Sequence, residues 1–235
     1  MTHPGPGLRA VIFDLDGTLV DTADDFVPVV QALRAEAGLE PMNEARIRAT
    51  VSNGARALVT LALGITDTHA DFEARRLRLL ELYEAILGAH AQPYAGMRDL
   101  IATLTERGIA WGVATNKPRY LTLPLLDGLR LTAASVVCPE DVARRKPDPE
   151  SIHRACEELG CRPREAIYVG DHARDIEAGR RAGAYTIAAA YGYIEPGDRA
   201  DSWGADRVVA ASTDVAAAIF ADADTAMTDI GRHAS

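Results

Sequence analysis

Six short apolar segments recur along the chain of 235 residues, and a turn and a helical pattern follow most of them. Their length and their β-branched and aromatic side chains are typical of buried strands. They occupy residues 10–13, 109–114, 135–138, 166–169, 185–189 and 207–210. Strands that alternate with helices predict an α/β fold, with a Rossmann-like, doubly wound parallel sheet and helices on both of its faces. In such sheets, ligands bind at the carboxyl ends of the strands.

The chain between the first two of these segments is too long for an ordinary crossover. It covers residues 14–108, whereas a crossover with its helix needs about 30 residues. The excess has apolar side chains at helical spacing over residues 24–37, 44–63 and 71–89, with a break at 52–54. We therefore expect a helical cap domain, residues 21–93, inserted into the Rossmann-like core.

The expected core consists of residues 1–20 and 94–235, and its small, polar end from residue 221 to residue 235 is expected to be a flexible tail. The formal net charge of −9 argues against nucleic acids and anionic membrane surfaces as partners. No apolar run is long enough to span a bilayer and the N-terminus lacks a signal-peptide pattern, so we expect a cytoplasmic protein. We further expect a monomer or a weak dimer. Three cysteines without metal-ligand spacing fit reduced thiols.

Two aspartates directly follow the first apolar segment. Asp14 and Asp16 are separated by one residue, and alternate residues of an extended chain point to the same side. The two carboxylates can therefore converge, which is tolerated where a cation neutralises them or where one keeps a proton for acid–base chemistry. A solvated Asp-rich turn is the alternative, and three later segments argue against it.

Counting Asp14-Asp16 as the first of four segments, the second is Thr115-Asn116, which follows the strand expected at 109–114. A hydroxyl and turn amides at the end of a strand can bind phosphate oxygens. Lys117 and Lys146 are the only lysines among 25 basic residues, which suggests sites that need a compact ammonium rather than a guanidinium fork. Codon bias is an equally good explanation for Lys117. Lys146 belongs to the third segment, and Arg144-Arg145 just before it fits a solvated basic run.

The last segment places Asp171 and Asp175 after the strand expected at 166–169. They lie one helical turn apart, so both can face one site, although Asp171 could instead cap the next helix. Together, Asp14, Asp16 and Asp171 would form a hard, oxygen-rich site that suits Mg²⁺.

In this order, the four segments resemble the four motifs of the haloacid dehalogenase superfamily of phosphohydrolases, and the resemblance covers most of the chain. It implies that Asp14 attacks phosphorus and forms an aspartyl-phosphate intermediate. It also implies that Asp16 protonates the leaving group and then activates water. The metal would be held by Asp14, by the backbone carbonyl of Asp16 and by Asp171, with Asp175 in support.

The same resemblance implies that Thr115, the Asn116 amide and Lys146 hold the phosphoryl oxygens of a small phosphorylated metabolite. Phosphonoacetaldehyde hydrolases use a cap lysine, which residues 21–93 lack, and haloacid dehalogenases lack the second aspartate. A phosphatase is therefore expected. A phosphosugar mutase of the β-phosphoglucomutase type stays open, and a catalytically inactive binding module is a more remote alternative because every catalytic position is filled.

Substrate choice is expected to depend on the cap, where Ser52, Asn53, Gly54 and Arg56 form the break between helices. Arg56 could bind a substrate carboxylate, or it could be an exposed helical arginine. Beyond the motifs, the chain is similar to the phosphoglycolate phosphatase group. Residues 52–59, 137–150, 191–196 and 203–206 are more similar to its N-acetylmuramic acid 6-phosphate phosphatase branch. Both substrates carry a carboxylate, so Arg56 does not separate them.

Overall fold

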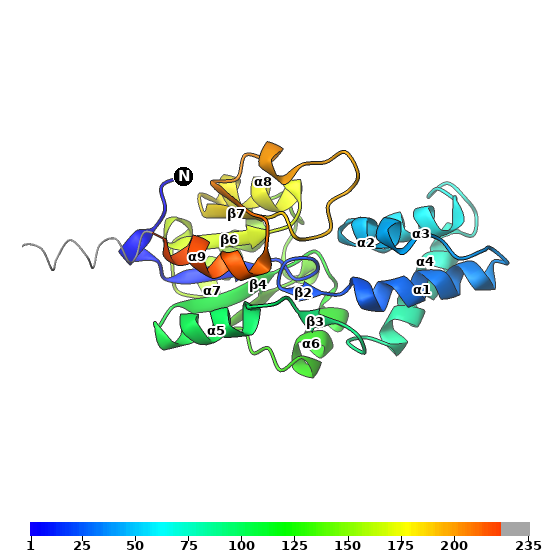
Figure 1. Ribbon diagram of the computed structural model, residues 1–235, viewed down its shortest axis with the longest axis horizontal. Helices are drawn as coiled ribbons and strands as arrows, with labels where there is room; N and C mark the ends of the chain where they lie inside the picture. The colour runs from blue at the N-terminus through cyan, green and yellow to red at the C-terminus, as the bar shows by residue number, and fades with distance from the viewer. Residues whose placement is uncertain (222–235) are drawn as a thin grey trace, which may run out of the picture.

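The computed structural model describes residues 1–221 and contains a parallel sheet between helices, with a helical lobe beside it (Figure 1). In the described residues the main sheet has the strand order β5-β4-β1-β6-β7-β8, and every neighbouring pair is parallel. The strands are β1 Ala10–Phe13, β4 Ala110–Ala114, β5 Ser135–Val137, β6 Ala166–Gly170, β7 Tyr185–Ala189 and β8 Arg207–Val209. The expected Rossmann-like fold is confirmed, and the expected tail lies, apart from Ala221, outside the described residues.

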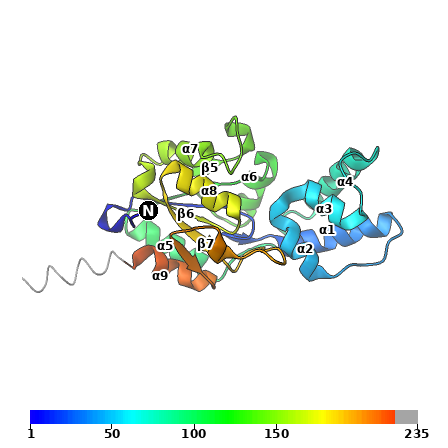
Figure 2. The same cartoon turned by 90° about the horizontal axis from the view of Figure 1, so that it is seen from above.

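Both faces of this sheet are covered by helices, which explains why its strands are nearly continuous apolar runs. Side chains of β1 alternate between the two faces. Val11 and Phe13 pack in one core with helices α5 Met97–Glu106, α6 Arg119–Gly128 and α9 Val215–Phe220. Ala10 and Ile12 pack in the other core with α7 Glu150–Glu158 and α8 Ala173–Ala182. Figure 2 shows α7 and α8 on one side of the sheet, and α5 and α9 on the other.

A helical region is inserted between β1 and β4, after the short strand β2 Val20–Asp21. It consists of α1 Ala23–Glu36, α2 Glu44–Thr50, α3 Gly54–Leu63 and α4 Phe72–Ala85. A 3₁₀ turn, Val51–Asn53, separates α2 from α3 where the sequence predicts a break. The chain then returns through β3 Gln92–Pro93, which pairs antiparallel with β2. The region therefore forms a separate lobe joined to the sheet by a two-stranded ribbon (Figure 1).

This lobe has its own apolar core, because each helix turns one face inward. Phe26, Leu33, Ile47, Leu58 and Tyr83 are among its buried members. The division of the chain into a cap of residues 21–93 and a core of residues 1–20 and 94–235 stays a prediction. Among residues 1–221, no helix has both the length and the apolar character that crossing a bilayer requires.

Candidate active site

Polar residues gather at the carboxyl ends of three neighbouring strands. Because β1 lies between β4 and β6, residues that follow these strands meet at the middle of one sheet edge. Asp14 follows β1, Thr115 follows β4 and Asp171 follows β6, and all three are buried. This is the edge at which open α/β sheets bind ligands.

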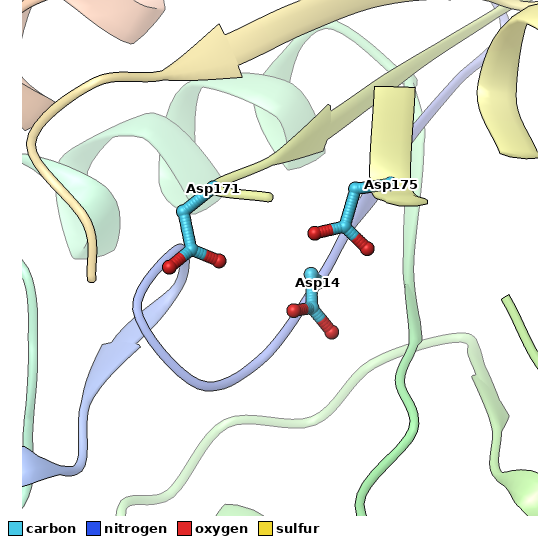
Figure 3. A group of neighbouring side chains, drawn as sticks. All are labelled: Asp14, Asp171 and Asp175. Carbon is cyan, nitrogen blue, oxygen red and sulfur yellow. The ribbon is translucent and has the colours of Figure 1, made fainter. Parts of the chain in front are cut away.

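Three buried carboxylates face one another at this edge (Figure 3). One oxygen from each of Asp14, Asp171 and Asp175 lies within 4.8 Å of the others. Burial, reinforced by the charges of Asp14 and Asp175, raises the pKa of Asp171 to about 7. Carboxylates crowded in this way repel one another, so a divalent cation would stabilise their ionised forms.

The Asp171 carboxylate is fixed by three donors. Its Oδ1 accepts from the Thr18 hydroxyl at 3.0 Å, and its Oδ2 accepts from the Ser52 hydroxyl and the Tyr193 N–H, each at 2.9 Å. Gly17, with φ +83°, passes so close that a Cβ there would lie 2.2 Å from Asp171 Oδ2. Hard oxygen donors held in fixed positions are what Mg²⁺ requires, so the residues present fit this ion.

Lys146 neutralises part of this negative charge. Its ammonium lies 2.8 Å from Asp14 Oδ1 and 2.7 Å from Asp175 Oδ1, and it also donates to the Ala114 carbonyl and the Tyr168 hydroxyl. Burial alone would lower the pKa of Lys146, but Asp14 and Asp175 outweigh burial and raise it. The lysine therefore stays charged, and its compact ammonium suits a site in which two carboxylates, a carbonyl and a hydroxyl surround one atom.

Thr115 and Asn116 connect the segment after β4 to Lys146 and Lys117. The Asn116 amide exchanges two hydrogen bonds of 3.3 Å with the backbone of Lys146. The Thr115 hydroxyl accepts from the Lys117 N–H at 3.1 Å, which leaves its own proton to donate. The second and third sequence segments are thus joined directly.

Asp16 lies apart from the three-carboxylate cluster. Its side chain accepts a hydrogen bond of 2.7 Å from the Thr22 hydroxyl, and the ammonium of Lys117 lies 3.0 Å from its Oδ1. The resemblance assigned only the backbone carbonyl of Asp16 to the metal, and this side-chain position is compatible with that role. Lys117, for which the sequence left two explanations open, is buried beside Asp16.

A cavity of about 490 Å³ joins the sheet edge to the helical lobe. On the side of the sheet, its walls include Asp14 and Asp16. On the side of the lobe, they include the residues expected at the break between helices, namely Ser52, Asn53, Gly54 and Arg56. The side chain of Arg56 is 57% exposed and lies 3.3 Å from Asp67 and 3.9 Å from Glu73. Its guanidinium is therefore already partly neutralised.

Three further arginines, Arg76, Arg145 and Arg174, line this cavity, and they were not among the site residues predicted from the sequence. Arg145, interpreted there as part of a solvated run, is exposed and forms no ion pair within residues 1–221. Arg174 donates to the carbonyl of Ser52 and so links α8 to the helical lobe. Nothing in the sequence separates Arg145 from Arg144, which pairs with Asp148 at 3.1 Å.

Comparison with known proteins places this geometry in a family. A model of haloacid dehalogenase-like hydrolases matches residues 11–189, from β1 to the end of β7. The chain belongs to this family. The resemblance to this family is confirmed, and the four segments that carry it lie at one edge of the sheet.

Curated members of the haloacid dehalogenase-like family resemble the chain along most of its length. An N-acetylmuramic acid 6-phosphate phosphatase of Pseudomonas aeruginosa is 45% identical over 204 residues, which cover 86% of this chain and 90% of that protein. A phosphoglycolate phosphatase of Xanthomonas campestris is 40% identical over 203 residues, covering 86% and 91%. The chain is a phosphatase of this family, as its sequence predicts.

The fold of this haloacid dehalogenase-like phosphatase also matches solved structures. The crystal structure of a predicted phosphoglycolate phosphatase from Haemophilus somnus superposes with a TM-score of 0.79 and 22% identity. The match covers 89% of this chain and 96% of that one. It therefore includes the inserted helical lobe as well as the sheet.

Proposed function

We propose that this phosphatase uses Mg²⁺ to hydrolyse a small carboxylate-bearing phosphomonoester, and that N-acetylmuramic acid 6-phosphate is a better substrate than 2-phosphoglycolate. The observation that carries the proposal is the cavity of about 490 Å³ that reaches from Asp14 to the turn between α2 and α3. Sites for drug-sized ligands usually measure about 300–1,000 Å³. A phosphorylated amino sugar belongs to this size class, whereas phosphoglycolate is much smaller.

In the proposed reaction Asp14 is the nucleophile. Lys146 contacts Asp14 Oδ1, so Oδ2 is available to attack phosphorus. A P–O bond to Asp14 forms while the P–O bond to the substrate oxygen breaks, which leaves an aspartyl-phosphate. The Asp14 and Asp171 carboxylates and the Asp16 carbonyl would hold Mg²⁺, with Asp175 in support, and the bound ion would neutralise phosphoryl charge.

The phosphoryl group would be held by three groups that meet at this edge of the sheet. The Thr115 hydroxyl and the Asn116 N–H would donate to its oxygens, and the Lys146 ammonium would oppose its charge. All three residues are held in place before substrate arrives, Lys146 by its buried contacts, the Asn116 side chain by its bonds to the Lys146 backbone, and the Thr115 hydroxyl by the Lys117 N–H. Donors fixed in advance stabilise a transition state without the cost of reorganisation.

Asp16 would be the acid and base of the two steps. It would give a proton to the leaving alkoxide, and then take a proton from the water that attacks the aspartyl-phosphate. Inorganic phosphate would leave and Asp14 would be free again. The position of Asp16 on the wall of the same cavity supports this role, because a leaving oxygen must lie beside it.

Substrate choice would depend on the lobe side of the cavity. Ser52, Asn53, Gly54 and Arg56 line it, as do the apolar side chains Phe26, Val51 and Leu80, while Leu121 of α6 lies on the cavity wall of the sheet domain. A sugar ring with an acetamido group can pack on these apolar walls, while its carboxylate can bind an arginine. The higher identity to the N-acetylmuramic acid 6-phosphate phosphatase supports the same order of substrates.

The test is release of phosphate from N-acetylmuramic acid 6-phosphate and from 2-phosphoglycolate, each with and without Mg²⁺. An Asp14→Asn variant serves as the control for contaminating activity. We expect kcat/KM above about 10⁴ M⁻¹s⁻¹ for the first substrate, with lower values for the second and none in the variant. A higher value for 2-phosphoglycolate would overturn the substrate assignment, and activity in Asp14→Asn would overturn the nucleophile.

A further inference from the structure

A buried lysine joins the proposed acid–base residue to the helical lobe. Lys117 follows β4, and its side chain is 4% exposed. Its ammonium lies 3.0 and 3.4 Å from the two carboxylate oxygens of Asp16, and 2.7 Å from the hydroxyl of Tyr83 on α4. A charged group of the sheet domain is thus held from both sides.

The lobe contributes an aromatic pocket for this ammonium. Tyr83 is fully buried and stacks on Phe26 of α1, with ring centroids 4.0 Å apart and planes 11° apart. The Lys117 ammonium lies 4.5 Å from the Tyr83 centroid and 5.3 Å from the Phe26 centroid. Ring faces at these distances attract a cation, and they do so more strongly where water is excluded. Because both rings belong to the lobe, the ammonium has this pocket only when the lobe is docked.

The choice of lysine supports a specific role for this position. Only Lys117 and Lys146 are lysines among the 25 basic residues, and both ammonium groups contact aspartates of the proposed reaction. A guanidinium is planar and broader, so it would not fit between a carboxylate, a hydroxyl and two ring faces as a compact ammonium does.

We propose that Lys117 is a positioning residue that makes the placement of the Asp16 carboxylate depend on docking of α1 and α4. With Tyr83 and Phe26 against the ammonium, Lys117 holds Asp16 in one orientation on the cavity wall. With the lobe displaced, water replaces these contacts and the long lysine side chain regains its freedom. Proton transfer to the leaving group is therefore favoured only when the lobe is docked and the cavity is closed and poor in water. This inference rests on the acid–base role proposed for Asp16.

The test removes the lobe's hydroxyl and leaves its ring in place. For Tyr83→Phe, the rate of the first turnover is measured with excess enzyme. The substrates are the faster of N-acetylmuramic acid 6-phosphate and 2-phosphoglycolate, both alkyl phosphates, and, separately, p-nitrophenyl phosphate. An alkoxide must be protonated as it leaves, whereas p-nitrophenolate leaves without a proton. We expect release of the alcohol to slow by roughly tenfold, a part of the 10²–10⁴-fold that acid–base catalysis typically contributes, with p-nitrophenolate release nearly unchanged.

Tyr120→Phe is the matched control, because Tyr120 lies on α6, is 49% exposed, and loses the same hydroxyl. Lys117→Met is the second variant, and it should show the same dependence on the leaving group, to a larger extent. Equal slowing of both substrates in Tyr83→Phe, or no slowing of either, would overturn the coupling. An Asp16→Asn variant measured alongside distinguishes failure of the acid–base assignment from failure of the coupling. If it retains alkyl phosphate turnover, the acid–base assignment fails; if it alone shows the leaving-group effect, only the coupling fails.

Discussion

The Lys146 ammonium lies 2.8 Å from the Asp14 carboxylate, and both groups are buried at the end of β1. Removing one partner of a buried ion pair leaves the other charge without compensation. Lys146→Met should therefore lower the free energy of unfolding by about 3–5 kcal/mol, measured by urea denaturation. It should also abolish phosphatase activity, because the phosphoryl group loses its cation.

Lys146→Arg is the sharper variant, since it keeps the charge. The ammonium also contacts Asp175, the Ala114 carbonyl and the Tyr168 hydroxyl, so there is no room for a planar fork. We expect this variant to be destabilised and to retain about 1% of kcat or less, a loss of the size seen when one preorganised donor is removed. Wild-type activity in Lys146→Arg would show that only charge matters at this position.

The parallel strands could be predicted from the sequence because each is buried on both faces and so appears as a short apolar run. All six are found with ends within one residue of those expected. The break at Ser52–Gly54 could also be predicted from the sequence, because it interrupts a long helical pattern. In the structure, Gly54 there has φ +78°. By contrast, β2 and β3 have two residues each, too few to show any periodicity.

The contacts between the lobe and the sheet domain could not be predicted. The Ser52 hydroxyl donates to Asp171 across 119 positions, and Tyr83 meets Lys117 across 34. Such contacts depend on how the lobe docks on the sheet domain, and no local pattern encodes that. This is why the sequence could propose Asp171 as a site residue yet left the purpose of Lys117 undecided.

Metal binding should change the stability of the folded protein. An ion that binds only the folded state stabilises it by about 2.7 kcal/mol at 100 times its Kd. Adding Mg²⁺ to EDTA-treated protein should therefore raise Tm, and Asp171→Asn should remove that response. Because burial and two neighbouring carboxylates raise the pKa of Asp171 to about 7, the same variant should have a higher Tm than wild type without metal at pH 8.

The control for this experiment is Asp201→Asn, at an exposed aspartate that pairs with Arg199. It should keep the full Mg²⁺ response, which excludes a general effect of net charge. If Asp171→Asn keeps the response as well, the ion binds elsewhere. Thermal denaturation followed by circular dichroism is sufficient to distinguish these results.

Stability in acid should depend on Glu165, whose carboxylate accepts hydrogen bonds from Arg162. The Arg162 guanidinium and N–H lower the pKa of Glu165 from 4.5 to about 2. A lowered carboxylate pKa contributes stability above the unfolded value, and this contribution is lost as the pH falls from about 4.5 towards 2. The Tm difference between wild type and Glu165→Gln should thus be constant above pH 6 and shrink below pH 4.5.

The pair is exposed, so the effect should be small and should weaken further in 1 M NaCl, where screening is strong. Glu106→Gln, at another exposed glutamate, is the matched control for the loss of one negative charge. A Tm difference that grows on acidification would reverse the expected sign and refute the assignment.

Substrate carboxylate recognition can be divided between two arginines of the cavity. Arg56 lies near Asp67 and Glu73, whereas Arg145 forms no ion pair in the described part of the chain. A guanidinium already paired with carboxylates has less to gain from another. We therefore expect Arg145→Ala to raise KM for a carboxylate-bearing substrate by roughly tenfold or more, the size of one lost charge-assisted hydrogen bond, with kcat nearly unchanged.

Arg56→Ala should raise the same KM by a smaller factor, and an unchanged value would remove Arg56 from carboxylate recognition. Arg144→Ala is the matched control, since this neighbour of Arg145 is 75% exposed and pairs with Asp148. Steady-state kinetics with p-nitrophenyl phosphate, which lacks a carboxylate, should give wild-type KM in all three variants. If KM for that substrate rises in Arg145→Ala, this arginine contributes to phosphate binding, and recognition of the carboxylate must lie elsewhere on the cavity wall.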